Sequence, residues 1–261
     1  MNTTRHPVAL ITGASRGIGE EFAHIYAKNG YDLVLVARSE ADLNALKKRV
    51  ERAYPVRAYV YVQDFSQDDA AHHVADYLAK EKLDVDALVN NAGFGDFGYF
   101  WEGSKDKQLS LLHVNIIALV HLTRLIVPGM VARGRGHVLN VASIAASSAG
   151  PKMALYYASK AFVLSFSEAL QEELKGTGVT STALCPGPTR TNFEATADLK
   201  NSHMFTWLRP ATAKKVAEIG YRAAQRGKAI QFAGITPLML HLMSRVAPRS
   251  LSRKFARLIN G

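Results

Sequence analysis

Two adjacent tyrosines followed by a lysine form the stretch of this sequence whose spacing points most directly to chemistry. The segment YYASK places Tyr156 four residues and Tyr157 three residues before Lys160. On a helix, side chains three and four residues apart are surface neighbours, so both spacings bring a phenol near the ammonium group. The pattern therefore predicts either a proton donor beside the charge that tunes it or an ordinary contact on a helix surface.

Reduction of a carbonyl group by hydride transfer needs such a donor, because negative charge builds up on the carbonyl oxygen. A free tyrosine has a pKa of about 10 and takes part reluctantly near neutral pH. An ammonium group about 4 Å away contributes roughly 4 kcal/mol at an effective dielectric constant of about 20. This predicts a tyrosine pKa lowered by up to about 3 units, before desolvation reverses part of the shift.

The elements that must position this motif alternate between short apolar runs and longer amphipathic stretches. Near-continuous apolar runs are typical of strands that a parallel sheet buries on both faces. Strands that alternate with helices of this length predict one α/β domain over residues 1–261, with a doubly wound sheet of about seven parallel strands and helices on both faces. The expected strands are 8–12, 32–37, 56–62, 85–90, 136–142, 179–185 and 228–234, and the expected helices are 17–29, 40–53, 67–80, 111–133, 152–175 and 211–226.

A glycine-rich turn, TGASRGIG at 12–19, follows the first expected strand with the spacing Gly-x-x-x-Gly-x-Gly. Glycines permit a tight turn and let backbone N–H groups approach a pyrophosphate, which the N-terminus of the following helix stabilises. A tight strand-to-helix turn without a ligand is the competing interpretation, and the turn alone does not exclude it.

The ends of the second and third expected strands bear on the adenosine half of a dinucleotide. An acidic residue after the second strand would bind the ribose 2′-hydroxyl of NAD, whereas an arginine accommodates the 2′-phosphate of NADP. The strand leads into Arg38 with no carboxylate before Glu40, and Arg16 of the glycine turn can reach the same pocket. Because guanidinium groups bind phosphate oxygens in a bidentate manner, the pair predicts NADP(H). Asp64, after the third strand, either binds the adenine amino group or caps a helix that begins near Ser66.

Taken together, these motifs resemble the short-chain dehydrogenase/reductase family. The resemblance rests on TGASRGIG at 12–19, NNAG at 90–93, Asn115, Ser143, YYASK at 156–160 and PGPTRT at 186–191, which occur in the family's order within residues 7–235. It implies a Rossmann-type fold and the reduction of a ketone or aldehyde to an alcohol, or the reverse reaction, with NADP(H). It also implies that the catalytic pair is Tyr-x-x-x-Lys, which selects Tyr156 and leaves Tyr157 to pack against neighbours of its helix.

The resemblance assigns roles residue by residue. It implies a catalytic set of Asn115, Ser143, Tyr156 and Lys160, in which Ser143 holds the substrate oxygen as charge develops. Lys160 would also hold the nicotinamide ribose, and Asn115 would help to hold a proton-relay water. The asparagines of NNAG would tie the central sheet together by amide hydrogen bonds. The expected cofactor-binding residues are Gly13, Ser15, Arg16, Gly17, Ile18, Gly19, Arg38, Asp64, Asn91, Ala92, Gly93, Tyr156, Lys160, Pro186, Gly187, Thr189 and Thr191.

Two aromatic segments are expected to wall the site of a small-molecule carbonyl or alcohol substrate. They are residues 94–101 and the loop of about 188–212, which contains Phe193, Phe205 and Trp207. Aromatic walls suit an apolar or extended substrate, although the rings would equally pack a lid without touching one. An NADPH-binding regulator without turnover is the alternative function, but a pure sensor would not require the catalytic set.

The net charge of +10 is concentrated towards one end of the chain, since eight Lys and Arg residues and no Asp or Glu follow Glu218. Residues of about 235–261 predict basic amphipathic helices on either side of Pro248. We interpret this segment as a contact with a partner subunit or a lid over the site. A solvated terminal helix and a peripheral contact with an anionic membrane are alternatives. Nucleic-acid binding is not expected, because its field would be spread over the surface.

The remaining features concern the compartment and the assembly. The single cysteine, Cys185, excludes an internal disulfide and fits a reducing compartment. The first residues lack the apolar core of a signal peptide, so we expect a cytoplasmic protein. The apolar window 114–132 is interrupted by polar residues and predicts a buried helix rather than a membrane span. His72 and His73 face different directions on their expected helix, so no metal site is expected. The family resemblance implies a homodimer or homotetramer through helices 111–133 and 152–175.

Overall fold

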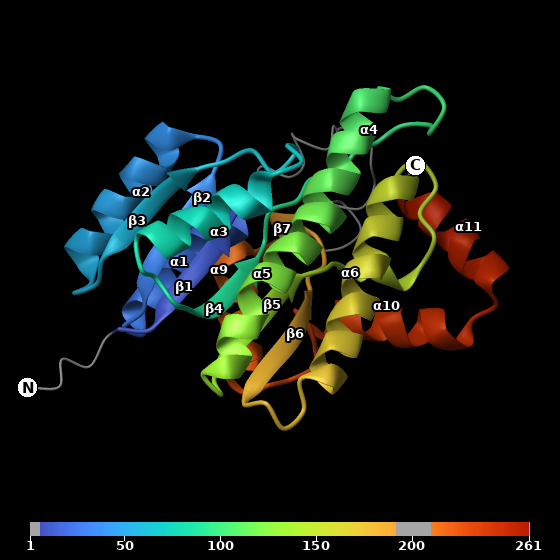
Figure 1. Ribbon diagram of the computed structural model, residues 1–261. Coiled ribbons are helices and arrows are strands. Elements are labelled where there is room, and N and C mark those ends of the chain that lie inside the picture. The colour runs from blue at the N-terminus through green and yellow to red at the C-terminus, as the bar shows by residue number, and fades with distance from the viewer. Residues whose placement is uncertain (1–5, 192–209, 261) are drawn as a thin grey trace, which may run out of the picture.

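The computed structural model describes residues 6–191 and 210–260, and a single parallel sheet organises them (Figure 1). Its seven strands are ordered β3-β2-β1-β4-β5-β6-β9, and every neighbouring pair is parallel. The predicted doubly wound α/β fold is confirmed. The strands are β1 (Val8–Thr12), β2 (Asp32–Ala37), β3 (Ala58–Val62), β4 (Val85–Asn90), β5 (Gly136–Val141), β6 (Val179–Cys185) and β9 (Ile230–Phe232), and β7 (Thr189–Arg190) pairs separately with β8 (Ala211–Thr212).

Helices cover both faces of the sheet. One face is covered by α1 (Gly17–Lys28), α2 (Glu40–Ala53) and α9 (Ala213–Gln225), and the other by α3 (Ala70–Lys80), α5 (Ala118–Ala132) and α6 (Ala154–Glu173). Helix α4 (Lys105–Leu112) leads into α5 through a π-helical segment, η1 (His113–Ile117). A short 3₁₀ helix, η2 (Ile144–Ser147), precedes α6, and α10 (Ile235–Val246) and α11 (Arg249–Asn260) follow the last strand.

The apolar strand sequences divide their side chains between two cores. In β1, Ala9 and Ile11 enter the core beneath α1, α2 and α9, whereas Val8 and Leu10 enter the core on the opposite face. Successive side chains of a strand point to opposite faces, so a strand covered by helices on both sides must be apolar at every position. This requirement explains why the strands were recognisable in the sequence as short continuous runs.

The long helix before β5 differs from its expected form in two ways. It begins at Lys105 rather than at residue 111, because Ser104 caps it by accepting a hydrogen bond from the Lys107 backbone N–H (3.4 Å). It also contains the five-residue π-helical segment η1. Short π-helical insertions of this kind are frequent at functional sites, and apolar periodicity alone does not reveal them.

The helical stretch Lys105–Ala132 is long and apolar enough to cross a membrane, with a mean hydropathy of 1.8 in its most apolar window. Helices of a soluble core satisfy the same criterion, so the finding is weak evidence for a span. Only 33% of that window is buried. The side that packs on α3, β4 and β5 is covered, whereas Ile117, Leu125 and Val131 are exposed. The expectation of a buried helix over residues 114–132 was therefore correct for one side only.

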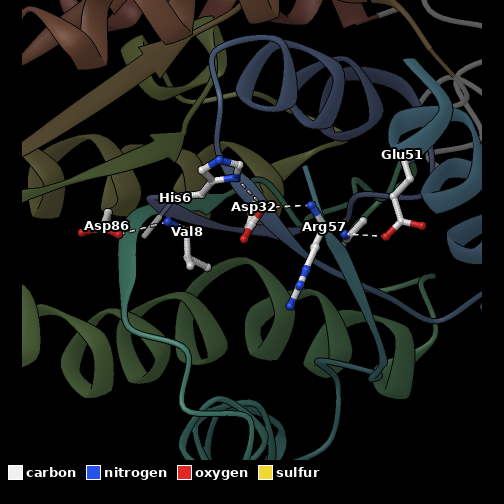
Figure 2. Close-up of polar contacts among 7 residues, drawn as sticks. His6, Val8, Asp32, Glu51, Arg57 and Asp86 are labelled. Atoms are coloured by element: carbon white, nitrogen blue, oxygen red, sulfur yellow. Dashed lines mark hydrogen bonds and ion pairs between the residues drawn. The ribbon is translucent and has the colours of Figure 1, made fainter. Parts of the chain in front are cut away.

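Carboxylates accept hydrogen bonds from the backbone at the amino ends of the strands, which is the end of the sheet opposite the predicted site (Figure 2). Each accepts a hydrogen bond from the backbone N–H of a residue at a strand start, which leaves fewer unpaired donors there. These bonds run from Val8 N to Asp86 Oδ2 (3.0 Å), from Arg57 N to Asp32 Oδ1 (2.8 Å) and from Ala58 N to Glu51 Oε1 (2.9 Å).

A buried histidine, His137, lies at the same amino end of the strands, in β5. His137 Nε2 is hydrogen-bonded to the hydroxyl of Tyr26 at 2.7 Å, and the two rings stack. Burial lowers the pKa of His137 to about 4, and the charge of Asp86 opposes this shift. The folded protein therefore holds this imidazole in its neutral form.

We expect the protein to lose stability as the pH falls from about 6.5 to 4. The unfolded chain binds a proton at this histidine near pH 6.5, whereas the folded chain does so only near pH 4. The free energy of unfolding should therefore drop by about 3 kcal/mol across this window, and the contribution should be fully present above pH 6.5. Urea unfolding at several pH values would measure it for the native chain and for His137→Gln. The exposed His73→Gln is the control, and equal pH slopes in all three proteins would contradict the assignment.

Candidate active site

A cavity of about 530 Å³ lies at the carboxyl ends of the strands. The strand order reverses direction between β1 and β4, and ligands of open α/β sheets bind at such a reversal. Every residue predicted for catalysis or cofactor binding lines this cavity except Gly19 and Asn115. The structure thus brings together Gly13, Ser15, Arg16, Gly17, Ile18, Arg38, Asp64, Asn91, Ala92, Gly93, Ser143, Tyr156, Lys160, Pro186, Gly187, Thr189 and Thr191.

The glycine turn after β1 requires glycine for two reasons. Gly13 and Gly17 have φ angles of +63° and +60°, which lie in the left-handed region that other residues rarely adopt. Gly19 is buried, and a Cβ there would lie 2.2 Å from the carbonyl oxygen of Gly13. Gly19 therefore lets α1 pack closely on the turn and does not itself face the cavity.

Asn91 and Thr12 hold the turn and the loop after β4 against each other. Asn91 Nδ2 donates to the carbonyl oxygens of Thr12 (2.9 Å) and Gly13 (3.1 Å). In return, Thr12 Oγ1 accepts from the backbone N–H groups of Asn91 and Ala92, both at 3.0 Å. Sequence reasoning assigned no role to Thr12, although its place directly before the glycine turn was visible.

Asn90 supplies the tie between the central strands that the family resemblance implied. Its Nδ2 donates to Asn140 Oδ1 of β5 and to Thr123 Oγ1 of α5, both at 2.9 Å. All three side chains are buried, and a buried amide needs such partners because it has lost those it had in water. The expected amide hydrogen bonds are confirmed, and Asn140 and Thr123 are the partners that the sequence did not identify.

The end of the cavity beside β2 and the glycine turn carries two guanidinium groups, of Arg16 and Arg38, and the carboxylate of Asp42 beside them. Arg16 donates from Nε (3.1 Å) and from its terminal nitrogen (2.8 Å) to Asp42 Oδ2. Hydrogen bonds from Arg16 and Ser39 lower the pKa of Asp42, so this carboxylate is charged at neutral pH. Arg38 is exposed and lines the cavity beside them. Asp42 was not predicted, because its contact with Arg16 joins two segments that are distant in the sequence.

Asp64 has a structural role that differs slightly from the expected one. Its Oδ1 accepts from the backbone N–H of Ser66 at 2.9 Å and closes a turn. The helix that follows, α3, begins only at Ala70, so Asp64 does not cap it. Because Asp64 also lines the cavity, its predicted contact with an adenine amino group stays a prediction.

Ser143, Tyr156 and Lys160 meet in the middle of the cavity wall. Ser143 follows β5 and caps η2, since its hydroxyl accepts from the backbone N–H of Ala145 at 3.1 Å. Tyr156 and Lys160 project from α6, and the ammonium nitrogen lies 5.9 Å from the centre of the tyrosine ring. Lys160 Nζ also donates to the carbonyl oxygen of Val141 at 2.8 Å, which fixes its position.

Burial controls the protonation of this group of side chains. It raises the pKa of Tyr156 to about 12, although a hydrogen bond with Ser143 acts in the opposite direction. It also lowers the pKa of Lys160 to about 8. The pKa of Tyr156 is therefore raised rather than lowered as expected, because desolvation by burial is the largest influence on it.

Asn115 stands behind the cavity wall. It lies in η1 and is almost fully buried. Its Oδ1 accepts from the Phe94 backbone N–H (3.1 Å), and its Nδ2 donates to the Phe94 carbonyl oxygen (3.0 Å) and to Ser159 Oγ (3.0 Å). Asn115 therefore fixes the loop after β4 to α6, and its expected contact with a relay water stays a prediction. Ser159, inside the YYASK motif, is a partner that sequence reasoning missed.

The substrate end of the cavity is apolar but differs from the expected aromatic wall. Of residues 94–101, only Phe94 lines the cavity. Tyr99, Phe100 and Trp101 are instead exposed, Trp101 by 76%, so most of the segment does not wall the site. The expected aromatics Phe193, Phe205 and Trp207 lie outside the described residues. The remaining walls at this end are Ser110, Val114, Ile144, Ala145, Met153 and Tyr157, the last of which was expected only to pack.

Other reactive groups are not gathered here. Within residues 6–191 and 210–260, no group of three His, Cys, Asp or Glu side chains could hold a metal ion. Burial raises the pKa of the Cys185 thiol to about 12, so it stays protonated.

The sequence of this chain is similar to a known protein family and to individual characterised proteins. Residues 7–202 match a protein family described as short chain dehydrogenase. The chain is 37% identical over 180 residues to 17-beta-hydroxysteroid dehydrogenase type 3 of Homo sapiens, which covers 68% of this chain and 57% of that protein. It is 37% identical over 179 residues to a very-long-chain 3-oxoacyl-CoA reductase of Mycosarcoma maydis, covering 67% and 51%. The chain thus spans about half the length of the curated relatives it matches.

The chain is also similar to one further relative and to two solved structures. An inactive hydroxysteroid dehydrogenase-like protein 1 of Homo sapiens is 33% identical over 205 residues, or 78% of this chain and 61% of that protein. A short-chain dehydrogenase from Sphingobium yanoikuyae, solved in complex with NADPH, superposes with a TM-score of 0.81 at 28% identity over 92% of this chain and 96% of that chain. A 7beta-hydroxysteroid dehydrogenase superposes with a TM-score of 0.85 at 26% identity over 96% of both chains.

Proposed function

This chain belongs to the short-chain dehydrogenase family, and we propose that it is an NADPH-dependent oxidoreductase that reduces a ketone or aldehyde to an alcohol. The observation that carries the proposal is one cavity that extends from Arg38 and the glycine turn to Ser143, Tyr156 and Lys160. Reduction of a carbonyl requires a nucleotide held beside the carbonyl carbon, which receives the hydride, and a proton donor within reach of the carbonyl oxygen, which receives the proton. Similarity to a hydroxysteroid dehydrogenase and to an oxoacyl-CoA reductase supports this class of reaction.

The chain offers a separate group of residues to each part of the dinucleotide, which when bound would supply the hydride. Backbone N–H groups of the glycine turn and the N-terminus of α1 suit the pyrophosphate. Arg16 and Arg38 suit a 2′-phosphate, because guanidinium groups bind phosphate oxygens in pairs. Thr189 and Thr191 also line the cavity and are proposed to contact the nicotinamide carboxamide and the pyrophosphate.

Tyr156 is proposed as the general acid. A proton donor must hold its proton until charge develops on the carbonyl oxygen, and a pKa of about 12 keeps the phenol protonated at neutral pH. Ser143, hydrogen-bonded to this tyrosine, is placed to hold the same substrate oxygen.

An apolar carbonyl substrate fits the far end of the cavity best. Phe94, Val114, Ile144, Ala145 and Met153 line it with apolar surface. A carbonyl group flanked by hydrocarbon would bury that hydrocarbon against these side chains while its oxygen meets Ser143 and Tyr156. The names of the relatives, which refer to steroids and very long acyl chains, agree with this class.

A regulator that binds NADPH without turnover is the second candidate. It is favoured by the likeness to a protein described as an inactive hydroxysteroid dehydrogenase-like protein. The joint presence of Ser143, Tyr156 and Lys160 at one cavity argues for the enzyme, since binding alone would not require a proton donor. Turnover of any carbonyl substrate decides between the two.

Replacing Tyr156 with phenylalanine should abolish turnover and leave NADPH binding largely intact. Loss of a general acid lowers rates by about 10²- to 10⁴-fold. NADPH consumption should be measured with steroid ketones, oxoacyl thioesters and simple aldehydes, and NADPH affinity by fluorescence titration. Tyr157→Phe is the matched control, because it removes a neighbouring hydroxyl and should leave a working enzyme. If Tyr157→Phe alone abolishes turnover in a folded protein, the assignment of the acid is wrong.

Replacing Arg38 with glutamine should weaken NADPH binding by at least about tenfold and leave NADH binding almost unchanged. A hydrogen bond to a charged group contributes about 1.5–3 kcal/mol, and only NADPH carries the 2′-phosphate. Titration of both nucleotides would measure the ratio of their dissociation constants. Arg49→Gln, which changes an arginine paired with Glu20, is the control. Equal weakening of both nucleotides would argue against a 2′-phosphate contact at Arg38.

We further propose that the exposed apolar side of the long helices is covered by a second copy of the chain. Leu109, Ile117, Leu125, Val131 and Phe162 are exposed large apolar residues of α4, η1, α5 and α6. Exposed apolar surface gathered on adjacent helices is typical of an interface. Sedimentation should give a mass of two or four chains, and Ile117→Arg with Phe162→Arg should lower it. Val62→Arg, at an exposed position of β3, should not, and a monomeric native chain would refute the proposal.

A further inference from the structure

Helix α10 carries a continuous row of exposed apolar side chains, here called the α10 stripe. Its members are Ile235, Met239, Leu242, Met243 and Val246, and their exposed fractions lie between 51% and 86%. Steps of three and four residues place them on one side of the helix. A single exposed apolar residue needs no explanation, but a contiguous row of five marks a contact surface.

The other side of α10 is fixed to the protein beside the catalytic cavity. Pro237 is buried, and its Cγ would lie 3.0 Å from a Cβ placed on Gly187. His241 Nδ1 is hydrogen-bonded to Ser147 Oγ at 2.8 Å. Ser147 ends η2, the short helix that Ser143 caps. Because α10 is anchored on this side, the α10 stripe is held outward and is not available as a lid over the cavity.

Basic side chains begin in the last turn of α10 and continue along α11. Arg245, Arg249, Arg253, Lys254 and Arg257 are all exposed. Leu251 and Leu258 of α11 are exposed as well, seven residues apart and so on one side of the helix. Figure 1 shows α10 and α11 together at one edge of the molecule, beside α6. Since no Asp or Glu follows Glu218, the segment itself holds no carboxylate to neutralise these cations.

We propose that α10 and α11 form a docking surface for an anionic phospholipid membrane. Amphipathic helices with apolar and basic sides lie at the boundary between headgroups and acyl chains, where the apolar side chains are buried and the cations meet anionic headgroups. Each basic residue at such a surface increases partitioning by about fivefold. The strength of such binding depends on the apolar area that is buried and on the attraction between cations and anionic lipids, and this segment offers both.

Charge decides between a membrane and a second copy of the chain as the occupant. Two copies that met through this surface would bring the same five cations of each chain together, and their repulsion would oppose contact. An anionic membrane instead supplies the missing negative charge. The proposal does not depend on the proposed function, and peripheral attachment is compatible with the expected cytoplasmic location.

Vesicle flotation of the full chain tests the proposal. The protein should float with vesicles of phosphatidylcholine and phosphatidylserine at low salt, and should float poorly with phosphatidylcholine alone or at high salt. Arg253→Gln with Lys254→Gln should reduce the bound fraction, by about fivefold in partitioning for each charge. Leu242→Ser with Met243→Ser should reduce partitioning by at least about tenfold, because less apolar area is buried.

Lys48→Gln with Arg52→Gln on α2 is the matched control. Both residues are exposed, and the double change removes the same two charges from a helix that also carries acidic residues. This variant should float like the native chain, and all variants should keep the native thermal midpoint because the changed side chains are exposed. Absence of flotation with anionic vesicles would overturn the proposal, as would equal loss in the α2 control. A lower sedimentation mass in the stripe variant, without vesicle binding by the native chain, would show that a second copy is the occupant.

Discussion

The hydrogen bonds of Asn90 and Asn91 are the constraint on which the rest of the site depends. Asn91 holds the loop after β4 against the glycine turn after β1, and Asn90 joins β4 to β5 and to α5. The strand order reverses at this place, where β1 and β4 pair directly, so these bonds fix the two loops that flank the cavity beyond the ends of the paired strands. With the loops fixed, the nucleotide-binding half and the half that carries Ser143 form one continuous wall. The buried amides also make the junction specific, because any displaced arrangement would leave polar atoms without partners.

Desolvation is the second determinant of the site. Tyr156 and Lys160 are both buried, and removal from water drives each towards its neutral form. Proximity of a cation to a phenol therefore does not by itself make a strong acid, because the same burial that brings the groups together weakens the charge of both. For a reductase this arrangement is suitable, since the tyrosine must keep its proton until the substrate oxygen becomes negative. Asn115 holds the neighbouring backbone from behind the cavity wall, and the carbonyl oxygen of Val141, a residue of the wall itself, holds the lysine.

Two exposed apolar surfaces lie outside the core, and they differ in the charged residues beside them. The surface on α4, α5 and α6 lies on long helices that pack on the sheet, where the partner we propose is a second copy of the chain. The surface on α10 and α11 carries cations, and these two helices contain no carboxylate of their own, so there we propose an anionic membrane. Both surfaces are built on elements that also touch the site, since α6 carries Tyr156 and α10 is bonded to η2. The two proposed contact surfaces are therefore connected to the proposed catalytic residues through packed elements.

The sequence by itself determined the positions of the apolar strands along the chain, the glycine turn, and the set of side chains that meet at the carboxyl ends of the strands. These follow from local rules, because strands buried on both faces must be apolar throughout and a turn with φ near +60° requires glycine. Only the tertiary structure decided the partner of Arg16, the π-helical segment that carries Asn115, the outward position of Trp101 and the raised pKa of Tyr156. Each of these depends on contacts between segments that are far apart in the chain, or on the burial that such contacts cause. Periodicity and spacing in the sequence do not predict how strongly a side chain is removed from water.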